Sequence, residues 1–166
     1  MTIQRLHLQT NEEILRLLSL QLASYRVEAE IIGFDDIPPL KDGIPSIREA
    51  LATETFYGYL SKVPGQQEPT LAGAISISRD SCVVTICRLM VHPDFFRRGI
   101  ASSLIAHIVE EQEQLGAARF IVSTGSANLP AIELYERFGF VVRRVFTVPP
   151  GVSLTTFERP ATSELS

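Results

Sequence analysis

The sequence predicts an α/β fold built on a mixed, mostly antiparallel twisted sheet. The hydrophobic period changes along the chain, from helical spacing in the first part to β-branched-rich runs in the middle, and helical spacing returns from Ile100. Turn residues at 64–69 and 79–81 favour antiparallel hairpins between those runs. A strand–helix–strand unit from Val83 to Ser123 requires one parallel, right-handed crossover inside the sheet.

The N-terminal elements are indicated by local patterns. Ile3–Leu8 alternates apolar and polar residues, as a strand with one buried face does. Thr10 and Glu13 match the Ser/Thr-x-x-Glu capping box, so we expect a helix over about 11–27. A short second helix is expected over about 45–52, where a proline suits the first turn.

The remaining elements follow from the same two periods and from the glycines that end them. We expect strands over 56–63, 70–78 and 83–91, a helix over 100–115, a strand over 118–123, a helix over 130–138, and a final hairpin of 140–148 with 152–157. One domain is expected over residues 1–166, with 160–166 as a frayed tail.

Composition limits the class of protein. A formal net charge of −4 over 166 residues argues against a nucleic-acid partner. No window approaches the roughly 18 apolar residues that span a bilayer, so no membrane partner is expected. Cys82 and Cys87 would lie roughly 15 Å or more apart on one strand, too far for a disulfide. A reducing cytoplasm is therefore expected.

The segment Phe96–Ala101 carries the chemistry. It connects the end of a strand near Val91 to a helix start at Gly99, where unpaired N–H groups and the helix dipole favour an anion. The alternative is a solvent-facing basic turn that merely starts a helix. The segment contains neither the Gly-x-x-x-x-Gly-Lys-Ser/Thr run of a P-loop nor the three glycines of a dinucleotide fingerprint. It predicts a diphosphate site of another kind.

This segment resembles the acetyl-CoA-binding motif of the GNAT superfamily of N-acetyltransferases, written Gln/Arg-x-x-Gly-x-Gly/Ala. Phe96, Gly99 and Ala101 occupy its three defined positions, and Phe96 departs from the usual glutamine or arginine. Arg97 and Arg98 are expected to replace the missing side-chain contacts. A second patch, from Asn128 through Tyr135 to Phe140, is similar to the family's Asn-x-x-Ala-x-x-x-Tyr-x-x-x-Gly-Phe pattern.

The resemblance implies a fold and a cosubstrate. It implies a GNAT fold, with helices on both faces of the sheet and the parallel strand pair splayed around acetyl-CoA, and it implies no metal. The cofactor-binding residues that it implies are Leu89, Met90, Val91, Phe96, Arg97, Arg98, Gly99, Ile100, Ala101, Ser102, Asn128 and Tyr135.

The implied roles are specific. Backbone groups of Leu89 and Val91 would bind the pantetheine arm, whereas their side chains are core residues. The N–H groups of 97–102 would hold the pyrophosphate. Asn128 is either an N-cap or a cofactor contact. Tyr135 is either a packed residue or the general acid for the departing thiolate.

The general base and the acceptor amine are less marked. Glu28 and Glu30 are the candidates for the base, acting through water, with an exposed helix end as the alternative. These two, with Asp35, Asp36 and Asp42, favour a cationic acceptor. His92 is expected to be structural, and Cys87 is expected in the core because it alternates with Leu89.

The predicted function is transfer of an acetyl group to a primary amine of a small molecule or peptide. The competing hypothesis is a non-catalytic acyl-CoA-binding module or sensor on the same fold. A phosphotransferase would need a lysine and metal-binding acids that the loop lacks. The final hairpin makes a homodimer plausible.

Overall fold

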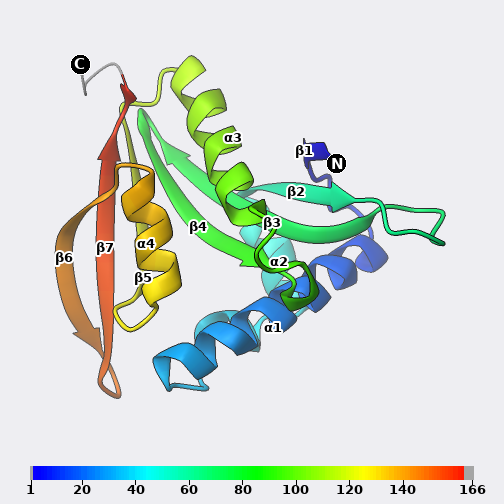
Figure 1. Cartoon of the computed structure of the whole chain (residues 1–166), viewed down its shortest axis with the longest axis horizontal. Helices are drawn as coiled ribbons and strands as arrows, with labels where there is room; N and C mark the ends of the chain where they lie inside the picture. The colour runs from blue at the N-terminus through cyan, green and yellow to red at the C-terminus, as the bar shows by residue number, and fades with distance from the viewer. Residues whose placement is uncertain (1, 163–166) are drawn as a thin grey trace.

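A computed structural model describes residues 2–162 as one seven-stranded sheet with helices on both faces (Figure 1). The strands lie in the order β1-β2-β3-β4-β5-β7-β6. Their bounds are β1 Thr2–Arg5, β2 Thr55–Ser61, β3 Thr70–Asp80, β4 Val83–Val91, β5 Arg119–Gly125, β6 Val141–Val148 and β7 Val152–Pro160. Among the strands of residues 2–162, only β4 and β5 pair in parallel, which confirms the mixed sheet predicted from the sequence.

Each face of the sheet has its own apolar core. Helices α1 (Asn11–Ile32) and α2 (Ile44–Ala50) share a core with Phe56 and Met90. Helices α3 (Ile100–Gln114) and α4 (Leu129–Arg137) pack on the other core, around Phe120. Two 3-10 helices, η1 (Pro38–Lys41) and η2 (Pro93–Phe95), connect these elements.

Helix α1 begins at the predicted residue and ends five residues beyond its predicted end. The Thr10 side chain accepts a hydrogen bond from the Glu13 N–H (3.2 Å), and Glu13 Oε1 accepts one from the Thr10 N–H (3.0 Å), which is the predicted capping box. Gly33, at φ 72°, closes the helix in the left-handed conformation that glycine adopts readily. The predicted end near Val27 was wrong because residues 28–32 contain no helix breaker, and these residues bring the helix across β5.

A β-bulge bends β4 in its middle. Ile86 pairs with Ile77 and Arg88 pairs with Ser76, so Cys87 is an extra residue on β4. Pairing of β4 with β5 also ends at Ile86, opposite Val122. Beyond this point the two strands diverge toward α1 (Figure 1). Cys87 is exposed, so its predicted place in the core was wrong, because the bulge breaks the alternation on which that prediction rested.

The C-terminal residues that the structure describes are packed. The Ala161 N–H donates to the Ala118 carbonyl (2.8 Å), and the Thr162 N–H donates to Glu113 Oε1 (2.7 Å). The expected frayed tail is therefore wrong for 160–162, and the rest of it, 163–166, lies outside the described residues. Across 2–162, no helix has the length and apolar character to cross a membrane.

Gly73 lets α3 approach the sheet closely, and this approach positions the loop before α3. A Cβ at Gly73 would lie 2.7 Å from Ile100 Cγ2 and 3.1 Å from the Met90 carbonyl oxygen. We expect Gly73→Ala to lower the free energy of unfolding by about 1–3 kcal/mol, as overpacked core substitutions do. Gly43→Ala is the control, because its Cβ would meet only Pro45 at 3.8 Å. Urea unfolding measures the free energy of unfolding of the two variants. Equal values for Gly73→Ala and Gly43→Ala would contradict the close approach of α3 to the sheet.

Candidate functional site

A cleft of about 570 Å³ opens where β4 and β5 diverge. Helix α1 and η1 bound it on one face of the sheet. The loop after η2 and the start of α4 bound it on the other. The divergence therefore joins the two faces of the sheet through one cavity.

The loop before α3 presents a row of backbone donors beside this cleft. Arg97 (φ 64°) and Gly99 (φ 72°) both adopt the left-handed conformation, which is strained for an arginine. Within residues 2–162, the N–H groups of 97–102 have no hydrogen-bond acceptor. Backbone turns of this kind and helix N-termini are anion-binding concavities. These backbone donors lie in the loop where the sequence predicts a diphosphate site.

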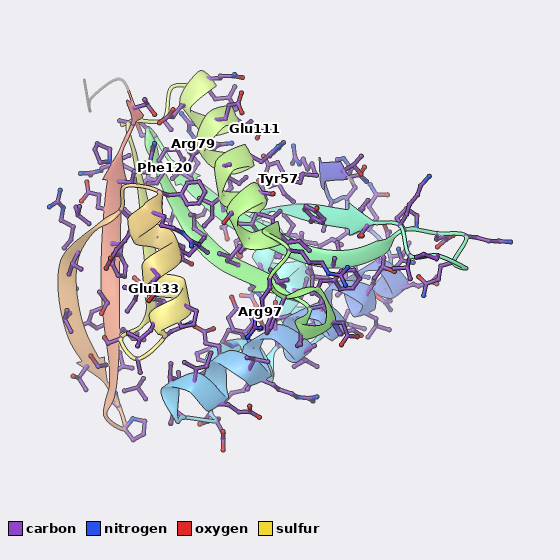
Figure 2. The ribbon with its side chains drawn as sticks, viewed as in Figure 1. Tyr57, Arg79, Arg97, Glu111, Phe120 and Glu133 are labelled. Atoms are coloured by element: carbon purple, nitrogen blue, oxygen red, sulfur yellow. The ribbon has the colours of Figure 1, made fainter. Side chains whose placement is uncertain are left out.

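The side chains of this loop divide between two roles. Phe96 and Arg97 line the cleft, and Figure 2 labels Arg97 where the chain passes from β4 over α1. Arg98 instead stacks over the Phe95 ring at 5.0 Å. Ile100 is buried against the sheet, so its contribution is limited to its backbone. Of the two arginines proposed as replacements for a polar residue at Phe96, Arg97 is the one at the cleft.

Glu28 is held inside the cleft by two donors from the opposite wall. Its Oε1 accepts hydrogen bonds from Asn128 Nδ2 (3.1 Å) and from Thr124 Oγ1 (3.2 Å). Burial raises the pKa of this carboxyl, and the two hydrogen bonds offset part of the increase. Glu30 is exposed and does not line the cleft, because it lies on the outer face of α1. Of the two candidates for the general base, only Glu28 therefore lines the cleft.

Asn128 has both an N-cap role and a place in the cleft. Its Oδ1 accepts from the Ala131 N–H (3.4 Å) at the start of α4, as an N-cap does. Its amide nitrogen donates to Glu28 instead of standing free for a cofactor. The N-cap interpretation is confirmed, and the structure adds a tether between α4 and α1.

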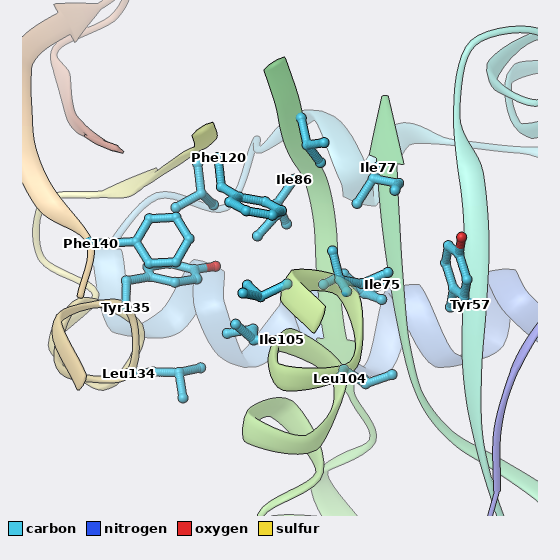
Figure 3. Close-up of a cluster of buried hydrophobic side chains, with 14 of the residues drawn as sticks. Tyr57, Ile75, Ile77, Ile86, Leu104, Ile105, Phe120, Leu134, Tyr135 and Phe140 are labelled. Atoms are coloured by element: carbon cyan, nitrogen blue, oxygen red, sulfur yellow. The ribbon is translucent and has the colours of Figure 1, made fainter. Parts of the chain in front are cut away.

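Tyr135 reaches the cleft from α4 through an aromatic cluster. The residue is 4% exposed, and its ring packs against Phe140 and Phe157 at 5.6 Å and 6.0 Å between centroids. Figure 3 shows the hydroxyl pointing away from α4. Tyr135 lines the cleft, and no hydrogen bond within residues 2–162 involves its hydroxyl. Burial, with Tyr25 and the Glu28 charge nearby, raises the pKa of the phenol, which keeps its proton.

The backbone of β4 faces α1 in the diverging region. The Leu89 N–H donates to the Tyr25 hydroxyl (3.3 Å), and the Val91 N–H donates to Ser24 Oγ (3.1 Å). The two N–H groups predicted to bind a pantetheine arm therefore already donate to hydroxyls of α1. Met90 is buried in the core beneath α1, away from the cleft.

Sequence reasoning missed Ser24, Tyr25 and Thr124. The first two lie one turn before Glu28 on α1, so helical spacing from Glu28 was the signal for them. Thr124 carries no local signal, since only the tertiary fold brings it to Glu28. His92 is structural, as expected: its Nδ1 accepts from the Asp94 N–H (3.1 Å) and caps η2. Within 2–162, no three His, Cys, Asp or Glu side chains are grouped to hold a metal ion.

Residues 17–140 match the family model described as the acetyltransferase (GNAT) family. The chain belongs to this family. The UPF0157 protein YqkA of Bacillus subtilis is 36% identical over 141 residues, 85% of this chain and 38% of that protein. The [ribosomal protein bS18]-alanine N-acetyltransferase of Escherichia coli K12 is 36% identical over 56 residues, 34% of this chain and 38% of that protein. The matched stretches thus cover well under half the length of these two relatives.

Solved structures have the same fold. The ribosomal-protein-S18-alanine N-acetyltransferase of Escherichia coli superposes with a TM-score of 0.73 at 17% identity, covering 96% of this chain and 93% of that one. A Bacillus subtilis acetyltransferase in complex with CoA superposes with a TM-score of 0.66 at 18% identity, covering 95% and 97%. These likenesses confirm the predicted fold class.

The environment of Glu28 makes a testable prediction about its ionisation. Carbon-detected NMR of the Glu28 carboxyl should give a pKa above the ordinary value of 4.5, because burial disfavours the charge. Thr124→Val should raise that pKa further by removing a donor to the carboxylate. Ser123→Ala, on the same strand but bonded to Thr156, is the control and should leave it unchanged. An unchanged pKa in Thr124→Val would contradict the contact.

The raised pKa of Glu28 makes the free energy of unfolding depend on pH. Because the folded pKa of Glu28 lies above its unfolded value, the folded chain binds more protons between the two pKa values. The stabilising contribution is full below the unfolded pKa and is lost as pH rises through the folded one. Glu28→Gln, which keeps an acceptor oxygen, should remove this pH dependence from the free energy of unfolding.

Proposed function

We propose that the chain is an acetyl-CoA-dependent N-acetyltransferase that moves an acetyl group directly to a primary amine of a small molecule or peptide. One observation carries the proposal: the unpartnered N–H groups of 97–102 lie beside the cleft that Arg97 and Tyr135 line. The loop N–H groups can donate hydrogen bonds to a pyrophosphate. The Tyr135 hydroxyl can donate a proton to the departing thiolate.

The comparisons support this proposal. The family match covers the loop and Tyr135. CoA is present in the Bacillus subtilis neighbour and in a Thermoplasma acidophilum N-acetyltransferase with a TM-score of 0.64. The relative that acts on an alanine of ribosomal protein bS18 makes a peptide N-terminus one candidate acceptor.

The proposed cosubstrate site uses backbone more than side chains. The N–H groups of 97–102 and the Arg97 guanidinium hold the pyrophosphate, and the bent half of β4 lies along the pantetheine arm. The N–H groups of Leu89 and Val91 bind that arm only in exchange for the Tyr25 and Ser24 hydroxyls. Acetyl-CoA supplies a reactive thioester, so holding the amine against it provides much of the rate.

The proton movements are assigned to two residues. The amine attacks the acetyl carbonyl carbon, a C–N bond forms and the C–S bond breaks. Glu28 receives the amine proton, directly or through water, and its raised pKa makes it a stronger base than an exposed carboxylate. Tyr135 donates its proton to the sulfur, and Asn128 and Thr124 position Glu28.

Location and assembly are parts of the same proposal. A cytoplasmic location fits the two free cysteines, Cys82 and Cys87, since reducing compartments keep thiols unpaired. The homodimer remains a prediction. The β6 strand lies at the edge of the sheet, where a second copy would pair.

Substitution of Gly99 tests the cosubstrate site. Gly99→Glu places a carboxylate among the donors of the loop, so we expect CoA binding, measured by calorimetry, to be lost. Its left-handed φ of 72° also strains any other residue by about 1–2 kcal/mol. Gly99→Ala is the matched control, because it carries this strain while its Cβ meets nothing within 4 Å. Equal CoA affinity in wild type and Gly99→Glu would overturn the proposed site.

Substitution of Tyr135 tests the chemistry. Tyr135→Phe keeps the aromatic packing and removes the proton donor, so kcat for CoA thiol release should fall by about 10²- to 10⁴-fold at unchanged CoA affinity. Phe140→Leu is the packing control and should affect stability more than kcat. Tight CoA binding without acceptor-dependent thiol release in the wild type would favour the non-catalytic sensor.

A further inference from the structure

We propose that the acceptor is a singly charged primary amine attached to an apolar group, instead of a polyamine or other multiply charged amine. This inference rests on the acetyltransferase activity proposed above and concerns the other end of the same cleft. It rests on which walls of the cleft are apolar and on which nearby acids already have cationic partners.

The cleft has two distinguishable ends. Phe96 and Arg97 line it from the loop that leads into α3, where the backbone donors collect. The opposite end is bounded by the last turns of α1, by η1 and by β7. Since the cosubstrate occupies the loop end, the acceptor enters from the α1 and η1 end.

The walls of the acceptor end are mostly hydrocarbon. They are formed by three residues of α1, the residues at the start of η1 and one residue of β7. These are Val27, Ile31, Ile32, Ile37, Pro38, Pro39 and Leu154. Ile31 is 42% exposed, although it is a large apolar side chain in the last turn of a surface helix. Each methylene that an acceptor buries against such walls raises its affinity by about fourfold.

The other acids of residues 28–42 fall into two groups. Glu30 and Asp35 are exposed and do not line the cleft, whereas Asp36 and Asp42 have cationic partners. Asp42 binds Arg88 (2.7 Å), and Asp36 binds Lys41 (2.8 Å). Arg88 is the cation of the acceptor end, and Glu54 also neutralises it (3.0 Å). Among the residues within 2–162 that line the cleft, Glu28 is the only carboxylate.

One carboxylate and an apolar wall fit an amine with one charge. The reacting ammonium meets Glu28, and the substituent beside it meets the isoleucines and prolines. A second ammonium on the same substrate would be desolvated against the apolar wall without an anionic partner. The acid-rich composition of residues 28–42 therefore does not produce a polycation site in the cleft, because those acids, other than Glu28, either face solvent or bind a cation of the chain.

An acceptor panel tests the inference. Pentylamine and putrescine have the same length, and one ends in a methyl group where the other ends in a second ammonium. With saturating acetyl-CoA, kcat/KM for thiol release should be at least about tenfold higher for pentylamine. A second arm compares peptides that begin with isoleucine and with lysine, and it distinguishes a peptide acceptor from a small amine.

A variant locates the preference on the proposed wall. Ile31→Asp adds a carboxylate beside Glu28 and removes apolar surface, so the pentylamine-to-putrescine ratio of kcat/KM should fall by about tenfold or more. The ratio is measured because a changed Glu28 affects both amines alike. Leu15→Asp is the matched control: Leu15 is 51% exposed on the same helix but outside the cleft, and the ratio should not change.

The outcomes separate this inference from the activity on which it rests. A preference for putrescine in the wild type, or an unchanged ratio in Ile31→Asp, would overturn the apolar acceptor and leave the acetyltransferase intact. If none of the amines and peptides supported thiol release, despite tight CoA binding, the proposed activity itself would be overturned. A pentylamine preference that falls only in Ile31→Asp supports the inference.

Discussion

The bulge at Cys87 is the constraint on which the rest of the structure depends. The extra residue bends β4 at the point where its parallel pairing with β5 ends, so the sheet opens while both strands keep their outer neighbours. Without that bend, the hydrogen bonds between β4 and β5 would continue and the cleft would be closed. The backbone N–H groups of Leu89 and Val91 face the opening for the same reason.

Helix α1 converts this opening into a partitioned site. Ser24 and Tyr25 bind the β4 side, and Glu28 binds Thr124 and Asn128 across the gap. The helix thus bridges two strands that no longer bond to each other. One end of the cleft is left with the donors of the loop, and the other with an apolar wall and a single acid. The proposed division between cosubstrate and acceptor follows from that asymmetry.

The fold class and the loop were predictable because their signals are local. The capping box at Thr10, the glycine before α3 and the Asn128–Tyr135 spacing are set by neighbours in the sequence. Contacts across the sheet were not predictable in this way. Glu28 and Glu30 look alike in sequence, and only the rotation of α1 against β5 directs one into the cleft and the other to solvent. Alternation placed Cys87 in the core, and the bulge moved it out.

By itself, the sequence determined the element order, the single parallel pair, the family and the position of the loop before α3, because each depends on periodicity or on a short motif. Only the tertiary structure decided that Arg97 lines the cleft while Arg98 stacks on Phe95, that Asn128 holds Glu28, and that Asp36 and Asp42 are neutralised. These outcomes depend on which side chains meet across the sheet. Whether a charge or a donor is available to a ligand depends on the partner that it finds in the folded chain.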